Sequence, residues 1–274
     1  MGKVVASIAI ALLSCGLCAA PQQTGSQTSS GDLHSQAAAA VLQQQFADPD
    51  VSYLLVDHKG QIVAQRWEEA QREVTVGSLI KPFIAVAYGR SHSSFPVYRC
   101  TGGKVCWLPR GHGKLGIRDA IALSCNSYFY QLYAQGAPGF AGPVLRSFGL
   151  NATTDGRSGS ASPVALAKAY LELAAQRRDK ALSSVIEGMA LSAKRGTGKA
   201  AGAELHGLSV LAKTGTAPCI HSRAVPGDGF AVLITPVDRA EQVLLVRVHG
   251  KPGSFAAGVA GKMLAAIENA GEAR

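Results

Sequence analysis

Three short motifs constrain this chain more than its composition does. They are Ser78-Leu79-Ile80-Lys81, Ser124-Cys125-Asn126 and Lys213-Thr214-Gly215-Thr216, in that order along the chain. Each motif is short enough to arise by chance. Together they provide a serine nucleophile, a lysine base, a second serine close to an asparagine, and a cationic site for a carboxylate. The chain therefore needs a fold that can use all of these groups together.

The first motif has the spacing of a nucleophile and its base. Ser78 and Lys81 are three residues apart, so on a helix their side chains lie on one face, one turn apart. A serine hydroxyl is a weak nucleophile until a base takes its proton. A lysine can be that base when partial burial or a cationic neighbour such as Lys213 lowers its pKa. For this motif alone, a helix-capping serine followed by an exposed lysine is the simpler interpretation.

The other two motifs carry groups that bind polar substrate atoms. Ser124 and Asn126 are short polar residues within an apolar stretch, which is typical either of a helix cap or of a loop that points into a site. The third motif follows a strand-like run. Its Gly215 would allow a ligand backbone to approach closely, and the hydroxyls of Thr214 and Thr216 beside an ammonium can hold a carboxylate.

Hydrophobic periodicity predicts an α+β fold. Strand-like runs occur near both ends of the chain, with a mainly helical region between them. We expect an antiparallel sheet of about five strands drawn from both chain ends, flanked by helices, with the helical region inserted as a subdomain. The predicted helices span residues 33–46, 78–89, 117–135 (a pair), 163–176, 183–194 and 255–270, and the predicted strands span 51–57, 61–66, 208–212, 230–235 and 242–249.

The first residues have the pattern of an export signal. Lys3 precedes an apolar run that is too short to be a comfortable bilayer span, and the run ends in Leu12-Leu13-Ser14-Cys15, which resembles a bacterial lipobox. Cleavage before Cys15 and lipidation of its thiol is the favoured interpretation. The alternative is cleavage after Ala20, which the following Pro21 disfavours. We therefore expect a signal peptide over 1–14, a flexible tether over 15–32 and a catalytic domain over 33–274.

Charge and cysteine content limit the partners. The net charge of +9 comes from scattered basic residues, which suits an anionic cell envelope and does not predict nucleic-acid binding. Cys100 and Cys106 flank a glycine-containing loop and could close a disulfide in an oxidising compartment. His112 alone does not complete a zinc site, so no metal and no cofactor is expected. Cys125 and Cys219 fit small buried positions, and a disulfide between them stays open.

The sequence around the motifs resembles a known family over about residues 51–267. The stretches that carry the resemblance are Gly77-Ser78-Leu79-Ile80-Lys81-Pro82-Phe83, Gly111-His112-Gly113 before Ser124-Cys125-Asn126, and Gly196-Thr197-Gly198 before the third motif. They resemble the transpeptidase domain of the high-molecular-weight penicillin-binding proteins, in the superfamily of serine β-lactamases and D,D-peptidases. The long N-terminal domain of those large proteins has no counterpart in this sequence.

The resemblance implies the catalytic roles. Ser78 would be acylated by the D-Ala-D-Ala end of a peptidoglycan stem peptide, or by penicillin. Lys81 would be the base, and Ser124 would pass a proton to the leaving group, with Lys213 tuning it. The implied activity is that of a D,D-transpeptidase or carboxypeptidase, which is exported to the periplasm or cell envelope and reaches the membrane only through its lipid anchor.

The resemblance also implies how the substrate is held. Asn126 would bind the substrate amide, and the Thr214-Gly215-Thr216 segment would hold the terminal carboxylate. The backbone N–H groups of Ser78 and Thr216 would form the oxyanion hole.

Two other functions are alternatives. A serine β-lactamase needs a base that hydrolyses the acyl-enzyme, but neither Glu172 nor Glu187 is followed four residues later by the asparagine of the commonest class. Oxacillinase-type enzymes carry a valine where this chain has Asn126. The second alternative is a sensor of β-lactams or muropeptides without turnover, for which the chain shows no attached signalling domain.

Overall fold

The computed structural model describes residues 30–136, 139–152, 158–177, 179–219 and 226–272. These residues form an α+β fold built on a five-stranded sheet in the order β2-β1-β10-β9-β8, with every neighbouring pair antiparallel. The expected fold class is confirmed. The strands are β1 (Val51–Asp57), β2 (Ile62–Arg66), β8 (Leu211–Ala217), β9 (Asp228–Thr235) and β10 (Gln242–Val248).

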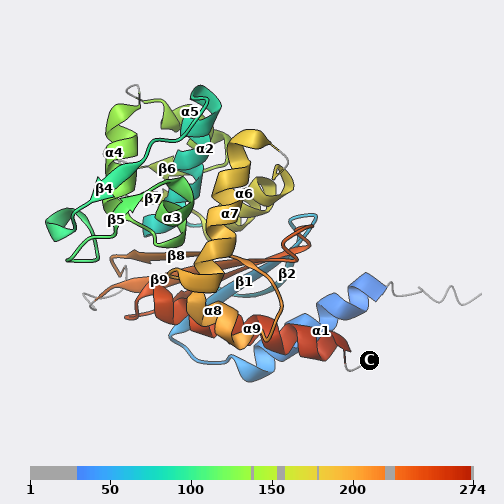
Figure 1. Ribbon diagram of the computed structural model, residues 1–274. Coiled ribbons are helices and arrows are strands. Elements are labelled where there is room, and N and C mark those ends of the chain that lie inside the picture. Colours follow the sequence, from blue (N-terminus) through green and yellow to red (C-terminus); the bar gives the residue numbers. More distant parts are fainter. Residues whose placement is uncertain (1–29, 137–138, 153–157, 178, 220–225, 273–274) are drawn as a thin grey trace, which may run out of the picture.

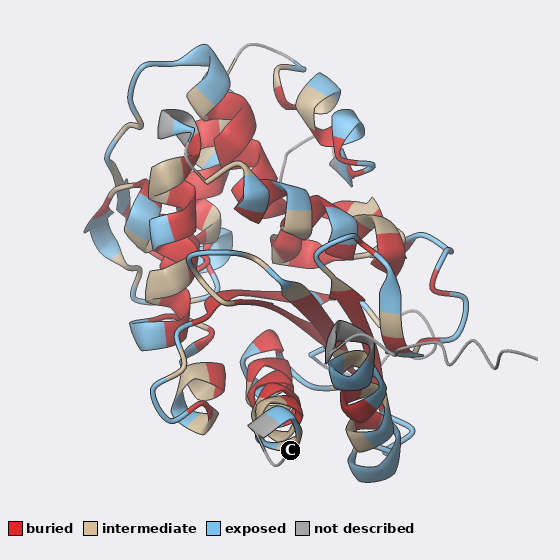
Figure 2. Ribbon diagram, turned by 90° about the vertical axis from the view of Figure 1, so that its right-hand side faces the viewer, coloured by how far each residue is buried: buried red, intermediate tan, exposed pale blue. Residues whose placement is uncertain are grey.

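The sheet is buried on both faces and separates two hydrophobic cores. Successive side chains of a strand point to opposite faces, so in β10 Val243 and Leu245 join one core while Leu244 and Val246 join the other. Figure 2 shows the central strands of the sheet in the colour of buried residues, whereas the edge strand β2 is largely exposed. One face is covered by α1 (Ser30–Gln45) and α9 (Gly253–Glu272), and the helical region covers the other (Figure 1).

The helical region lies between β2 and β8 in the chain. It also carries a small three-stranded sheet and a two-stranded pair. Its helices are α2 (Lys81–Ser91), α3 (Ile117–Ala122), α4 (Asn126–Gln135), α5 (Ala141–Ser147), α6 (Pro163–Ala175) and α7 (Lys180–Arg195), followed by α8 (Lys199–Glu204) against α9. Its short strands are β3 (Val74–Thr75), β4 (Tyr98–Cys100), β5 (Gly113–Leu115), β6 (Asn151–Ala152) and β7 (Gly159–Ala161), and its 3-10 turns are η1 (Gly77–Ile80) and η2 (Gly103–Val105).

The structure differs from the predicted elements at several ends. Ser78 lies in η1, and α2 begins only at Lys81, because Pro82 lacks an N–H group and is accommodated in the first helical turn. Helix α1 begins at Ser30, inside the segment expected to be a tether. The expected signal peptide, the expected lipidation site Cys15 and most of the expected tether lie outside the described residues. None of the described helices combines the length and apolar content needed to cross a bilayer.

Two backbones touch where the first and third motifs meet. Gly77 has φ +54°, and a Cβ atom placed on it would lie 2.3 Å from the carbonyl oxygen of Thr216. From the opposite side, a Cβ on Gly215 would lie 2.7 Å from the carbonyl oxygen of Val76. Only residues without a side chain allow this approach. The contact holds η1, which carries Ser78, against the edge strand β8.

This contact predicts an unusually costly glycine substitution. Gly77→Ala is expected to lower the free energy of unfolding by about 1–2 kcal/mol for the positive φ and by about 1–3 kcal/mol more for the clash. Gly113→Ala is the matched control, because Gly113 has φ +75° and open space around it. Urea unfolding midpoints of the two variants measure the difference, and equal losses would contradict the close approach.

Candidate active site

One cavity brings the three motifs together. It has a volume of about 630 Å³ and lies where η1, the α3–α4 connection and β8 meet. The motif residues that line it are Ser78, Ser124, Asn126, Thr214, Gly215 and Thr216. Lys81 and Lys213 are buried behind this lining, with 1% and 0% of their surfaces exposed. Segments far apart in the sequence therefore form one site, as the motifs predicted.

Lys81 is bonded to the second motif. Its Nζ donates to the carbonyl oxygen of Ser124 at 2.8 Å and to Oδ1 of Asn126 at 2.5 Å. Burial lowers the pKa of Lys81 to about 7, and the neighbouring thiols of Cys125 and Cys106 oppose this shift. A large share of Lys81 is therefore a neutral amine near neutral pH, and such an amine can accept a proton.

Lys213 holds the hydroxyl of the same serine. Its Nζ donates to Oγ of Ser124 at 2.9 Å and to the carbonyl oxygen of Thr214 at 2.6 Å. Burial, and then the charge of Lys81, move the pKa of Lys213 well below its ordinary value. Ser124 has φ +50°, a conformation that a residue with a side chain keeps only when its surroundings hold it. Ser124 thus binds one lysine through its carbonyl and the other through its hydroxyl.

The third motif is braced from two sides. The Thr214 hydroxyl donates to Oγ1 of Thr197 at 2.6 Å, and the N–H of Gly253 donates to Oγ1 of Thr216 at 3.0 Å. The Thr216 side chain is exposed to solvent, whereas Thr214 is buried. A hydroxyl whose oxygen already accepts a bond can still donate its proton, so Thr216 presents a donor for an anionic group.

Several lining residues were not identified from the sequence. Arg195 and Lys199 add positive charge to the cavity, and Trp107 forms part of its wall. Trp107 is held there by a hydrogen bond from its Nε1 to the carbonyl oxygen of Leu123 at 3.1 Å. The two cations flank Gly196-Thr197-Gly198, and this is the only sequence signal for them. Nothing in the sequence around Trp107 marks it as part of the site.

A cluster of cysteines lies against the second motif. The ligand atoms of Cys100, Cys106, His112 and Cys125 all lie within 4.8 Å of one another. Nδ1 of His112 is 3.4 Å from Sγ of Cys106 and 3.6 Å from Sγ of Cys100, and the sulfurs of Cys106 and Cys125 are 3.9 Å apart. Cys100 and Cys106 are both free thiols, so the disulfide expected between them is not formed in this structure.

The donor set of this cluster fits a structural zinc ion, which is bound tetrahedrally by thiolates and imidazole. Burial raises the pKa of Cys100, but hydrogen bonds from His112, Gly102 and Cys125 together outweigh burial and bring it to about 6. The sequence argument against a metal counted His112 beside two cysteines and left out Cys125. Because Cys125 lies between Ser124 and Asn126, an ion held here would bear directly on the second motif.

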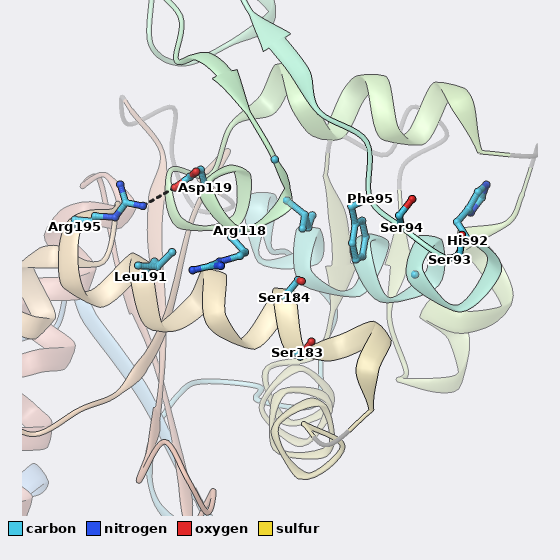
Figure 3. Close-up of a pocket in the computed structure, with 13 residues that line it drawn as sticks. His92, Ser93, Ser94, Phe95, Arg118, Asp119, Ser183, Ser184, Leu191 and Arg195 are labelled. Carbon is cyan, nitrogen blue, oxygen red and sulfur yellow. Dashed lines mark hydrogen bonds and ion pairs between the residues drawn. The ribbon is translucent and has the colours of Figure 1, made fainter.

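A second, larger cavity lies away from the motifs. Figure 3 shows its lining residues between the end of α2, α3 and α7. Its volume is about 940 Å³. Its wall includes Arg118 and serines of α7, and Arg195 pairs with Asp119 across it at 2.7 Å. Its lining contains none of the motif residues. The smaller cavity is therefore the candidate active site on chemical grounds.

Comparison with known proteins identifies the fold. No protein-family model matches the sequence, and no curated protein is similar enough in sequence to match. Solved structures do match. PBP2 of Pseudomonas aeruginosa in complex with WCK 5153 has a TM-score of 0.69 and 17% identity, covering 87% of this chain and 76% of that one.

Two further structures cover most of both chains. The TP domain of penicillin-binding protein 3 from Burkholderia pseudomallei has a TM-score of 0.67 and 18% identity, covering 87% of this chain and 92% of its own. The transpeptidase domain of the FtsI4 D,D-transpeptidase from Legionella pneumophila has a TM-score of 0.61 and 20% identity, covering 86% and 95%. The chain therefore has the fold of a penicillin-binding-protein transpeptidase domain.

Proposed function

We propose that this protein is a serine acyltransferase that acts on the D-Ala-D-Ala ends of peptidoglycan stem peptides and binds penicillin covalently at Ser78. One observation carries the proposal. Ser78 and Ser124 line one cavity, and two buried lysines with lowered pKa values bind Ser124 from either side. A nucleophile, a neutral base and a positioned hydroxyl are the groups that acyl transfer requires.

The acylation step uses these groups in sequence. Oγ of Ser78 attacks the carbonyl carbon of the penultimate D-Ala while neutral Lys81 accepts the serine proton. The backbone N–H groups of Ser78 and Thr216 stabilise the oxyanion. The C–N bond to the terminal D-Ala then breaks, and the leaving amine takes a proton from the Ser124 hydroxyl, which Lys213 holds at 2.9 Å. The proton that Lys81 accepted from Ser78 then returns to Ser124, so no proton is gained or lost overall.

Positive charge and hydroxyl groups support a substrate that ends in a carboxylate. Lys199 and the exposed Thr216 line the cavity together with Arg195, whose guanidinium also pairs with Asp119. Thr214 holds Thr197 in the wall. The space beside Gly215 is occupied by the carbonyl oxygen of Val76, so the expected approach of a ligand backbone to this glycine is replaced by the approach of the chain's own backbone. Asn126 would bind the substrate amide through its NH₂ group, because its Oδ1 accepts from Lys81.

The lining of the cavity argues against a β-lactamase. Among the described lining residues none is an aspartate or a glutamate that could activate a water for deacylation. Glu187 pairs with Arg118 at 3.0 Å, and Glu172 accepts from Gln176 at 2.9 Å. The acyl-enzyme is therefore expected to be long-lived in the absence of an acceptor. We further propose that the protein works in the cell envelope, exported by its N-terminal signal and anchored through a lipid on Cys15.

Covalent labelling tests the proposal. Incubation with a fluorescent penicillin is expected to give one adduct by intact mass, stable for hours, that is absent in Ser78→Ala. Ser93→Ala is the control, because Ser93 lines only the larger cavity, and it should label like the native protein. An adduct that clears rapidly with product release would indicate a β-lactamase. The absence of any adduct in the native protein would overturn the proposal.

The acylation rate should depend on the protonation of Lys81. Only the neutral amine accepts a proton, and its pKa is about 7. The rate of penicillin labelling should therefore rise about tenfold per pH unit below that value and level off above it. Lys81→Ala should abolish labelling. Lys59→Ala, which removes an exposed lysine, should leave the profile unchanged. A native rate that stays flat below pH 7 would exclude Lys81 as the base.

A further inference from the structure

A second group of side chains of the types that bind metals lies at the end of the strand that carries the third motif. It consists of Cys219, Asp228 and His249, whose ligand atoms all lie within 4.8 Å of one another. Nδ1 of His249 is 2.9 Å from Oδ1 of Asp228 and 3.3 Å from Sγ of Cys219. None of these residues belongs to the acyl-transfer machinery proposed above.

The register of the sheet assembles this group from three chain segments. Asp228 begins β9 and pairs with Ala217, the last residue of β8, two residues before Cys219. His249 directly follows β10, whose last residue Val248 pairs with Gly229. The three side chains therefore meet at one end of the sheet because three antiparallel strands begin or end there. Their sequence spacing gives no sign of this.

The geometry does not suit a thiol nucleophile. In a thiol–imidazole–carboxylate relay, the thiol and the carboxylate bind opposite ring nitrogens. Here Oδ1 of Asp228 and Sγ of Cys219 both come closest to Nδ1 of His249, and Sγ is 3.6 Å from Nε2. Two potential anions that converge on one nitrogen create a point of negative potential, where a cation is stabilised.

We infer that Cys219, Asp228 and His249 bind a divalent transition metal of the zinc class, with one coordination position left for water. Bond lengths of about 2.0–2.3 Å place neighbouring ligands of a tetrahedral zinc ion roughly 3.3–3.8 Å apart. The sulfur–nitrogen distance of 3.3 Å lies in this range. Because Sγ is also 3.6 Å from Nε2, the His249 ring must turn to direct a nitrogen at the ion, and the oxygen–nitrogen distance of 2.9 Å must open. A thiolate and an imidazole among the donors select zinc or cobalt over magnesium or calcium.

Burial and charge support a bound cation. Asp228 is 2% exposed, and a buried carboxylate requires a compensating charge. Cys219 and His249 are partly exposed, which gives an ion a path from solvent and leaves room for a water ligand. Arg247 acts electrostatically on both Asp228 and Cys219, but its Nη2 donates to Ser52 and its guanidinium lies 4.9 Å over the ring of Trp67.

The site adjoins the catalytic cavity. Pro226 and the Pro252–Ser254 turn line that cavity, and they lie close in sequence to Asp228 and His249. The N–H of Gly253 donates to Oγ1 of Thr216 at 3.0 Å. A metal that joins the ends of β8, β9 and β10 would therefore fix the wall that carries Thr216, without taking part in the acyl-transfer steps.

Metal binding to the full chain tests the inference. A Cys100→Ser/Cys106→Ser background removes the other cluster, so that any remaining equivalent reports on Cys219, Asp228 and His249. Equilibrium dialysis with Zn²⁺ under reducing conditions should give one equivalent. Co²⁺ should give the intense visible absorption of a four-coordinate ion together with a thiolate charge-transfer band. In this background, Asp228→Asn and His249→Gln should each weaken Zn²⁺ binding by more than about 100-fold. Asp238→Asn and His58→Gln change exposed residues of the same types and should leave binding unchanged.

The outcomes distinguish a metal site from a group of side chains that holds no metal. If the three side chains only contact one another and hold no ion, the background protein binds no equivalent of Zn²⁺ and shows no charge-transfer band, which overturns the inference. Retention of the metal in the ligand variants also overturns it. Should Asp228→Asn fail to fold by circular dichroism, Cys219→Ser at the partly exposed position decides, through loss of the charge-transfer band. Ser78→Ala should keep the zinc, so this test is independent of penicillin labelling.

Discussion

Two lysine side chains buried within reach of one serine are the constraint on which the candidate site depends. Each ammonium loses its water on burial, so both pKa values fall, and the charge of Lys81 lowers the pKa of Lys213 further. The protein satisfies their N–H groups with the carbonyls of Ser124 and Thr214, the Ser124 hydroxyl and Asn126. These partners are uncharged, so they do not restore the ordinary pKa values as a carboxylate would. The arrangement favours a neutral amine at Lys81, bonded to the second motif.

This environment lies at the boundary between the helical region and the five-stranded sheet. Ser78 and Lys81 come from the helical region, and Lys213 comes from the edge strand of the sheet. The backbone contact at Gly77 holds the helical region against the sheet. The N–H of Thr197 donates to the carbonyl oxygen of Ala122 at 3.0 Å, which joins the α7–α8 connection to α3. The two hydrophobic cores, one on each face of the sheet, stabilise the packing at this boundary. Because two packed bodies meet there, water is excluded from the lysines while Ser78 remains accessible.

The sequence was informative where chemistry or periodicity is local. The apolar runs of β1, β9 and β10 predicted the sheet, and residues of all three motifs line one cavity. The short α8 was missed because six residues carry little periodic signal, and β4 and β5 were missed for the same reason within a loop rich in glycine. Neither cluster of potential metal ligands could be predicted from the sequence. Cys125 joins Cys100 and His112 through the packing of the second motif, and Cys219 meets His249 through strand register.

A direct measurement of the lysine pKa values tests the central claim. The protein can be labelled with ¹³C and ¹⁵N at lysine and its side-chain resonances followed by NMR as the pH is raised, with Lys81 assigned by comparison with Lys81→Ala. The account predicts that Lys81 titrates at about 7 and that Lys213 also titrates well below the other lysines. If every lysine titrates near the ordinary value of about 10.4, the buried neutral base does not exist and the account is wrong.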